Sequence, residues 1–268
     1  MNTSINSILV DSANRFYINN DSSESIKIDK SVDALKFKMI QYFELTPNSI
    51  VEFGSYKRGT ILPRQFDENS DIDLMINFGN KNQILAPGTY RNKLISFCSN
   101  FYKFSRVYKS SPTVVLELDH IKYDLVPACI TQISIYNPVK YFIPENDSNW
   151  METNPVEFNS ELIRVNGVHG FNIKKVIRLI KAWNAKVNYP LNSFELEKEI
   201  TRHQFLGCYN LQDYFFSAID SITEYRYNNV TATLKIRALK ENKLKVMNAL
   251  FINDINTAKN WLSHILPS

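Results

Sequence analysis

Two short motifs in the first third of the chain carry residue types that could hold a triphosphate and a metal ion. The first runs from Gly54 to Thr60, and the second contains Asp71 and Asp73. The acids alternate with apolar residues as far as Phe78, which predicts that both carboxylates share one face of a strand whose other face is buried. Their Cα atoms would lie roughly 6.6 Å apart, within reach of one divalent ion or of two ions about 3.5–4 Å apart. Such oxygen ligands favour Mg²⁺, so we expect one or two Mg²⁺ ions here, for which Mn²⁺ can substitute.

The glycine motif has the chemistry of a phosphate-binding loop. Gly54 and Gly59 can approach a triphosphate closely and adopt positive φ, while Ser55 and Thr60 offer hydroxyl groups. The apolar stretch from Ser49 to Phe53 predicts a strand that leads into this loop. Either motif alone would be typical of a polar loop or of a solvated edge strand. Both motifs together, in this order and a short distance apart, favour a nucleotide-binding site.

A third carboxylate usually completes a two-metal site, and Asp124 is the leading candidate. The stretches Thr113–Leu118 and Ile121–Val126 are apolar and rich in β-forming residues, which predicts a hairpin or two adjacent strands. An acid within the second stretch is costly unless a cation or a hydrogen-bond donor pairs with it, and a basic neighbour is the alternative partner. Glu117 and Asp119 are the competing third ligands, although Asp119 fits a turn and Glu117 fits a solvent-facing position.

Together these residues resemble the polymerase-β-like nucleotidyltransferase superfamily, and specifically the cGAS/DncV-like nucleotidyltransferases, the CD-NTases of bacterial CBASS anti-phage systems. The likeness covers most of the chain. It rests on the motifs Gly54 to Thr60, Asp71 to Asp73, Tyr123 to Ala128, Arg178 to Trp183 and Leu191 to Glu197. The resemblance implies an α/β (α+β) fold in which a catalytic core with a mixed β-sheet packs against a C-terminal helical lobe, with the active site in the cleft between them.

The resemblance also implies roles for individual residues. Gly54 and Ser55 would hold the triphosphate, and the three acids named above would bind two Mg²⁺ ions and take part in catalysis. A lysine and a serine of the helical lobe would contact the phosphates, and the matching residues are Lys181 and Ser193.

The residues around Lys181 and Ser193 agree with that implication in part. From Ile173 to Val187 apolar residues recur at helical spacing with basic residues among them, which predicts a basic amphipathic helix. Lys181 lies next to the centre of the apolar stripe, where it faces either a cleft or solvent, whereas Arg178 is expected to face water. Ser193 fits the N-cap of a helix from Phe194 to His203. A helix N-terminus also binds phosphate, so a structural and a binding role are compatible.

Length and composition indicate a globular protein of one large domain or two closely packed lobes, because the chain has 268 residues of which 44% are hydrophobic. We place the catalytic lobe at residues 1–143 and the helical lobe at residues 144–268. A long first helix is predicted from Ser25 to Phe43, and another helix from Tyr90 to Lys103. The remaining predicted elements are a loop over Pro144–Glu157 and helices over Leu211–Ile222 and Thr231–Trp261.

Charge and cysteine content narrow the partners and the compartment. A formal net charge of +4 suits a cleft that attracts nucleoside triphosphates but is small for a dedicated polynucleotide-binding protein. The three cysteines are odd in number and contain no C-x-x-C pair, which is typical of reduced thiols. No window approaches the roughly 20 apolar residues of a membrane span, and the N-terminus lacks a signal-peptide pattern. We therefore expect a cytoplasmic monomer that has no membrane partner and needs no nucleic acid as activator.

The leading functional hypothesis is a cyclic dinucleotide synthase that joins two nucleoside triphosphates, releases pyrophosphate and signals to a downstream effector in anti-phage defence. We expect a guanine-containing product, c-di-GMP or a mixed dinucleotide. The alternative is a template-independent transferase that extends RNA or makes linear oligonucleotides, and only the resemblance favours the first. A catalytically silent nucleotide-binding module is disfavoured by the three intact acids. A toxin or antitoxin that transfers a nucleotide to protein or tRNA usually has a smaller catalytic domain.

Overall fold

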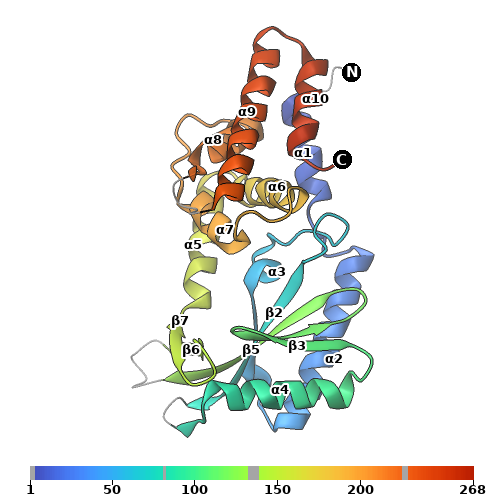
Figure 1. Ribbon diagram of the computed structural model, residues 1–268, viewed down its shortest axis with the longest axis vertical. Coiled ribbons are helices and arrows are strands. Elements are labelled where there is room, and N and C mark those ends of the chain that lie inside the picture. The colour runs from blue at the N-terminus through green and yellow to red at the C-terminus, as the bar shows by residue number, and fades with distance from the viewer. Residues whose placement is uncertain (1–3, 81–82, 132–138, 225–228) are drawn as a thin grey trace. The chain divides into compact units, whose positions relative to one another are not determined.

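The computed structural model describes residues 4–80, 83–131, 139–224 and 229–268, and the chain forms two compact units (Figure 1). Unit 1 comprises residues 1–18, 60–68 and 158–268, and unit 2 comprises residues 19–59 and 69–157. These units differ from the expected halves 1–143 and 144–268, because two segments of the N-terminal half belong with the helical C-terminal part.

Unit 2 is built on a mixed β-sheet. The strands are β1 (Ile50–Phe53), β2 (Asp71–Asn80), β3 (Arg106–Ser110), β4 (Thr113–Glu117), β5 (Lys122–Thr131), β6 (Lys140–Pro144) and β7 (Trp150–Thr153). Their order is β1-β2-β5-β4-β3, while β6 pairs with β5 and β7 with β6. The β2–β5 pair is parallel and the other pairs are antiparallel. The predicted α/β class with a mixed sheet is thereby confirmed, as are the strand before the glycine motif and the β4–β5 hairpin.

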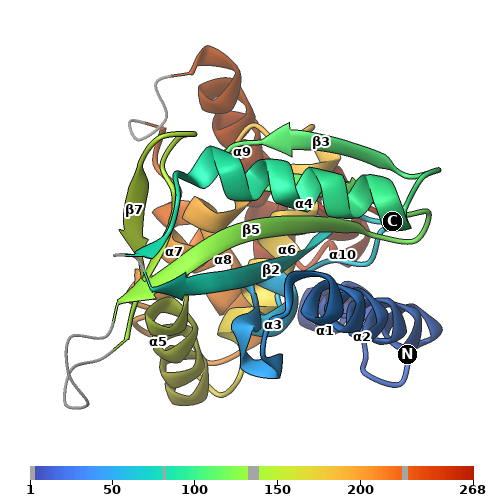
Figure 2. The same cartoon turned by 90° about the horizontal axis from the view of Figure 1, so that it is seen from below.

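Two helices, α2 (Ser23–Phe43) and α4 (Pro87–Phe101), cover one face of this sheet (Figure 2). α2 begins after its N-cap Ser22, whose hydroxyl accepts a hydrogen bond from the Ser25 N–H group. Ser31 of α2 shares a hydrogen bond with Tyr123 of β5. The rings of Phe43 and Phe97 lie 5.6 Å apart and join α2 to α4. Since side chains alternate along a strand, the neighbours of Tyr123 on β5 belong to the face that these helices do not cover.

Unit 1 is helical and has a core of its own. Its helices are α1 (Ile5–Arg15), α5 (Pro155–Val168, of which the residues from Phe158 belong to this unit), α6 (Ile173–Lys186), α7 (Ser193–Arg202), α8 (Leu211–Ser221), α9 (Val230–Phe251) and α10 (Ile255–Ile265). α9 and α10 pack side by side (Figure 1). α6 contacts α1, α7 and α8, and most of its residues are buried. In the described part of the chain, no helix is both long enough and apolar enough to cross a membrane.

The environment of α6 corrects one prediction. Arg178, expected to face water, is 6% exposed and donates through Nε to the Ala13 carbonyl oxygen at 3.3 Å. Burial lowers the pKa of its guanidinium to about 10. Arg178 is buried because α1, a helix that was not predicted, packs against α6. The helix predicted to be the first of the chain is therefore the second, α2.

The segment 144–157 was also predicted incorrectly as a loop. It contains the end of β6, all of β7 and the start of α5, so that only residues 145–149 join the two strands. Among the described strands β7 pairs with β6 alone, and its middle residues are exposed. An exposed edge strand accepts polar residues on both sides, which explains why its composition was typical of a loop.

Candidate active site

The acids of β2 and β5 lie on one face of the sheet, as the alternation predicted. Asp73 is directly opposite Asp124 in the parallel pair, and Asp71 is opposite Lys122. The residues between them point to the helix-covered face and are fully buried: Ile72, Leu74, Tyr123 and Leu125. The four charged residues themselves are half-buried. Adjacent strands lie about 4.8 Å apart, so this face groups three carboxylates within a small area.

Asp124 is the most perturbed acid of this group. The pKa of its carboxyl is raised from 3.8 to about 7, mainly by burial and then by the negative charge of Asp71, while the Thr113 side chain and the charge of Lys122 act in the opposite direction. The Lys122 ammonium donates to the Asn69 side chain at 3.0 Å. Attraction to Lys122 is therefore smaller than the combined effects of burial and of Asp71, and the ion-pair interpretation of Asp124 is disfavoured.

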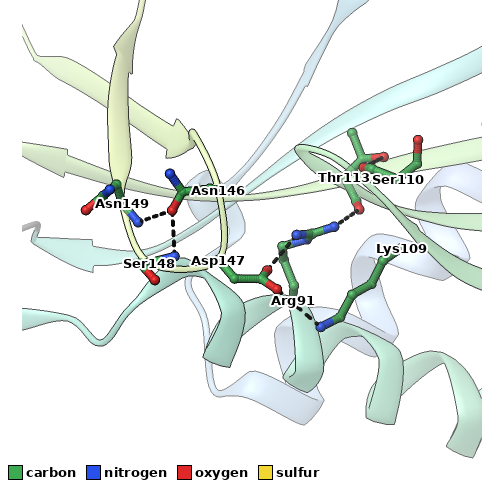
Figure 3. A network of polar contacts seen from close by, with 8 residues as sticks. All are labelled: Arg91, Lys109, Ser110, Thr113, Asn146, Asp147, Ser148 and Asn149. Carbon is green, nitrogen blue, oxygen red and sulfur yellow. Dashed lines mark hydrogen bonds and ion pairs between the residues drawn. The ribbon is translucent and has the colours of Figure 1, made fainter.

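Thr113, whose side chain lowers the pKa of Asp124 and whose hydroxyl donates to the Ser110 carbonyl oxygen at 2.9 Å, is held by a polar network at the start of β4 (Figure 3). Arg91 of α4 is buried and donates to the Thr113 carbonyl oxygen at 3.4 Å and to Asp147 at 2.6 Å. Lys109 lies 3.9 Å from the same carboxylate. Asp147 belongs to the loop between β6 and β7, so this loop supports Thr113 through Arg91.

Gly54 packs against the acids from the side of β1. Its φ is +71°, and a Cβ atom at this position would lie 2.8 Å from the Asp73 Cβ and would overlap the Asp73 carboxylate. The predicted glycine loop is a short helix, α3 (Gly54–Arg58), that ends at Gly59 with φ +69°. Ser55 lies in its first turn and is half-buried. Only glycine permits both the positive φ and the close approach to Asp73.

The competing acids occupy other places. Glu117 accepts a hydrogen bond from Tyr108 at 2.9 Å and lies 3.7 Å from Arg106. It is opposite Lys122 in the β4–β5 pair, whereas Asp124 is opposite Asp73. Asp119 lies in the turn between β4 and β5. Backbone register therefore favours Asp124 over Glu117 and Asp119 as the third acid.

The donor set of this face fits a hard divalent cation. Within the described residues, no three His, Cys, Asp or Glu side chains are arranged so that they could hold a metal ion without movement. However, Asp71, Asp73 and Asp124 share a face on two paired strands, and rotation about their side-chain torsions can direct their oxygens to one point. The charge of Asp71 raises the pKa of Asp124, and a bound dication would offset this repulsion. These three acids are the residues that would hold it.

The predicted site residues of unit 1 have different surroundings. Lys181 is buried and lies 3.2 Å from Glu197, so a solvent-facing position is wrong. Ser193 is the first residue of α7 rather than its N-cap, because the Asn192 side chain accepts hydrogen bonds from the N–H groups of the next two residues after Ser193. Thr60, expected to offer its hydroxyl to phosphate, donates it to Glu197 at 2.9 Å.

Two residues of these surroundings were missed by the sequence analysis, Glu197 and Thr113. Glu197 has a signal that could have found it, since it lies beside Leu196 and three residues before Ile200, on the buried stripe of its helix. A carboxylate in an apolar stripe requires a partner. Thr113 has no comparable signal, because its effect on the pKa of Asp124 acts between two strands.

Comparison with known proteins agrees with this geometry. The family described as "Second Messenger Oligonucleotide or Dinucleotide Synthetase domain" (SMODS) matches residues 6–166, and the chain belongs to this family. A probable cyclic nucleotide synthase of Bacillus cereus (strain VD146) is 31% identical over 98 residues, which are 36% of this chain and 30% of the relative. The match thus spans about a third of the length of each protein.

Two solved structures share the fold over nearly the whole chain. The CdnC:HORMA-deltaN complex of E. coli MS115-1 matches with a TM-score of 0.69 and 14% identity, covering 99% of this chain and 98% of that chain. The CD-NTase CdnG of Bradyrhizobium diazoefficiens in complex with GTP matches with a TM-score of 0.68 and 13% identity, covering 97% and 94%. At these identities the likeness shows the fold, which is the CD-NTase fold that the resemblance implied.

Proposed function

We propose that the protein is a cytoplasmic nucleotidyltransferase that makes a cyclic dinucleotide second messenger from two nucleoside triphosphates and releases pyrophosphate. The observation that carries this proposal is the group of Asp71, Asp73 and Asp124 on one face of β2 and β5, with Gly54 packed against Asp73. Membership of a family of second-messenger synthetases supports the same reaction.

In this reaction a ribose hydroxyl of one nucleotide attacks the α-phosphorus of another. The new phosphorus–oxygen bond replaces the bond to the β-phosphate, and pyrophosphate leaves with the electron pair. Mg²⁺, when held by the three acids, supplies neutralisation of the phosphate charge and acidifies the attacking hydroxyl. Asp124 accepts the proton of that hydroxyl as a general base. A second attack of the same kind closes the ring.

The remaining residues act by positioning. The N–H groups and hydroxyl near Gly54 and Ser55 orient phosphate oxygens, and the positive charge of Lys181 offsets part of the triphosphate charge. Ser193 lies at the start of α7, where its hydroxyl can donate to a phosphate oxygen and the positive end of the helix dipole favours the phosphate charge.

The finer parts of the proposal concern substrate and biology. The structural relative CdnG was solved with GTP, which supports a guanine nucleotide among the substrates and a guanine-containing product. The CdnC relative was solved with a HORMA-deltaN partner, which supports a protein partner for this chain, and we propose that nucleic acid is not its activator. We propose a role in anti-phage signalling through a cyclic-nucleotide-responsive effector.

The test is product identification. The purified protein is incubated with Mg²⁺ and each pair of the four ribonucleoside triphosphates, and phosphatase-resistant products are identified by mass spectrometry. We expect a cyclic dinucleotide that is absent with Asp71→Asn. Extension of added RNA without any cyclic product would instead support the template-independent transferase. Absence of both products, with the fold intact, would contradict the proposal.

A further inference from the structure

Lys181 is a buried cation that one carboxylate satisfies only in part. Its side chain is 6% exposed, and its Nζ lies 3.2 Å from Oε1 of Glu197, which is 1% exposed. A lysine ammonium group has three N–H donors. Across the residues that the structure describes, Glu197 is its one hydrogen-bond partner. Two donors are thus left for an acceptor of another kind, and burying them without one is costly.

Glu197 is itself held in place by two neighbouring segments. The Thr60 hydroxyl, which is fully buried, donates to the same Oε1 at 2.9 Å. Asn184, three residues after Lys181 on α6, donates to the Leu191 carbonyl oxygen at 2.8 Å and accepts from the Leu191 N–H group at 3.1 Å. The start of α7 is thereby fixed relative to α6. The Glu197 carboxylate is consequently a fixed point to which Lys181 is attached.

Thr60 connects this point to the glycine motif in sequence. The chain passes from unit 2 into unit 1 between Gly59 and Thr60, and the segment 60–68 belongs to unit 1. The far end of this segment is also held, because Tyr189 donates to Asp67 at 2.7 Å and the ring of Phe66 lies 4.7 Å from that of Phe16. Glu197 therefore joins Lys181 to the residue that directly follows the glycine motif.

We propose that Glu197 is a positioning residue that holds the Lys181 ammonium group for contact with a nucleoside triphosphate. The inference rests on the proposed function. Without nucleotide, the carboxylate offsets the cost of the buried cation. It also keeps the long lysine side chain in one rotamer, so that less conformational entropy is lost when phosphate oxygens accept the two remaining hydrogen bonds.

The competing interpretation is an ion pair that only stabilises unit 1. A double variant separates the positioning role from the purely structural role, because buried ion pairs can be replaced by uncharged pairs of similar size without loss of stability. Lys181→Met with Glu197→Gln removes both charges together, and glutamine keeps an oxygen that can accept from Thr60. The matched control is Lys243→Met, which removes another buried lysine of unit 1 that pairs with Asp220.

The experiment measures triphosphate affinity by calorimetry and thermal unfolding with and without each ribonucleoside triphosphate and Mg²⁺. We expect Glu197→Gln to bind triphosphate about tenfold more weakly, the equivalent of ~1.4 kcal/mol, with KM raised more than kcat is lowered. The double variant should unfold at a higher temperature than either single variant and still bind at least about tenfold more weakly than the unaltered chain. Lys243→Met should lower the unfolding temperature and leave the affinity unchanged.

Two results would overturn the inference in different ways. Unaltered affinity in the double variant, or in Glu197→Gln, would show that the pair is only structural, while leaving the proposed function intact. If no triphosphate binds or stabilises the unaltered chain in the presence of Mg²⁺, the proposed function fails and the inference fails with it.

Discussion

The acidic face of β2 and β5 in unit 2 and the Lys181–Glu197 pair in unit 1 hold charge in opposite ways. On the acidic face, burial and the charge of Asp71 raise the pKa of Asp124 to about 7, so like charges are grouped. In unit 1, a buried cation lies against a buried carboxylate. The first arrangement is costly until a cation binds, whereas the second is stable on its own and sets the position of a side chain in advance. Variants of the acidic face should therefore mainly lower the reaction rate, whereas variants of the Lys181–Glu197 pair should also lower the stability of the fold.

Apart from replacement of the acids themselves, the largest effect is expected at Gly54, where a side chain would displace an acid. Gly54→Ala should lower kcat by about 100-fold, because a Cβ would overlap the Asp73 carboxylate and displacement of a catalytic group by about 1 Å has an effect of that size. The rate of product formation at saturating triphosphate concentrations measures this loss in kcat. The matched control is Gly207→Ala, which has a similar φ of +69° and nothing within 4 Å of the added Cβ. Equal losses in both variants would mean that backbone strain, not the contact with Asp73, is responsible.

The next prediction tests the comparison directly through stability. In the metal-free protein, Lys181→Met should lower the free energy of unfolding by about 3–5 kcal/mol, because it leaves Glu197 buried without its cation. Asp124→Asn should leave that free energy unchanged or raise it, because it removes a buried like charge. Urea unfolding in EDTA measures both. A loss at Asp124 as large as that at Lys181 would show that Asp124 has a compensating partner in the fold.

A pH dependence follows from the same carboxyl group. The folded chain raises the pKa of Asp124 from 3.8 to about 7, so between these values the folded state binds more protons than the unfolded state. The free energy of unfolding therefore falls as pH rises through this window, by at most about 1.4 kcal/mol per pH unit. The difference between the unaltered chain and Asp124→Asn, measured in EDTA from pH 5 to pH 8, isolates this contribution. A difference that does not change with pH would contradict it.

The smallest effect is expected at Lys57, which is exposed in the last turn of α3. Lys57→Ala should raise KM about two- to threefold at low salt and less at high salt, because an exposed charge acts on the triphosphate through screened solvent. Lys30→Ala, which removes an exposed charge from α2, is the control for net charge. A loss at Lys57 comparable to that at Gly54 would show that its side chain contacts the nucleotide.

The acidic face could be predicted from the sequence because its signals are local. Alternation from Asp71 to Phe78 defines a strand and its faces, and an acid inside an apolar strand marks Asp124. The surroundings of Lys181 could not be predicted from the sequence, because the contact with Glu197 joins two helices and because α1, from a distant part of the chain, packs against α6.

The N-cap of α7 shows a finer limit of sequence reasoning. Asn192 and Ser193 are adjacent and both suit an N-cap, and the backbone geometry at Asn192, with φ −67° and ψ 124°, decides between them. The membership of residues 60–68 in unit 1 likewise depends on contacts such as Thr60 with Glu197, which no local pattern contains.

The most direct test of the acidic face as the catalytic centre compares product formation by Asp124→Asn and Glu117→Gln under identical conditions. The register of β5 beside β2 predicts that Asp124→Asn loses at least about 1,000-fold in rate with an unchanged circular dichroism spectrum, whereas Glu117→Gln, whose carboxylate contacts Tyr108 and Arg106, loses less than about tenfold. An active Asp124→Asn together with an inactive Glu117→Gln would contradict the assignment and move the third acid to β4.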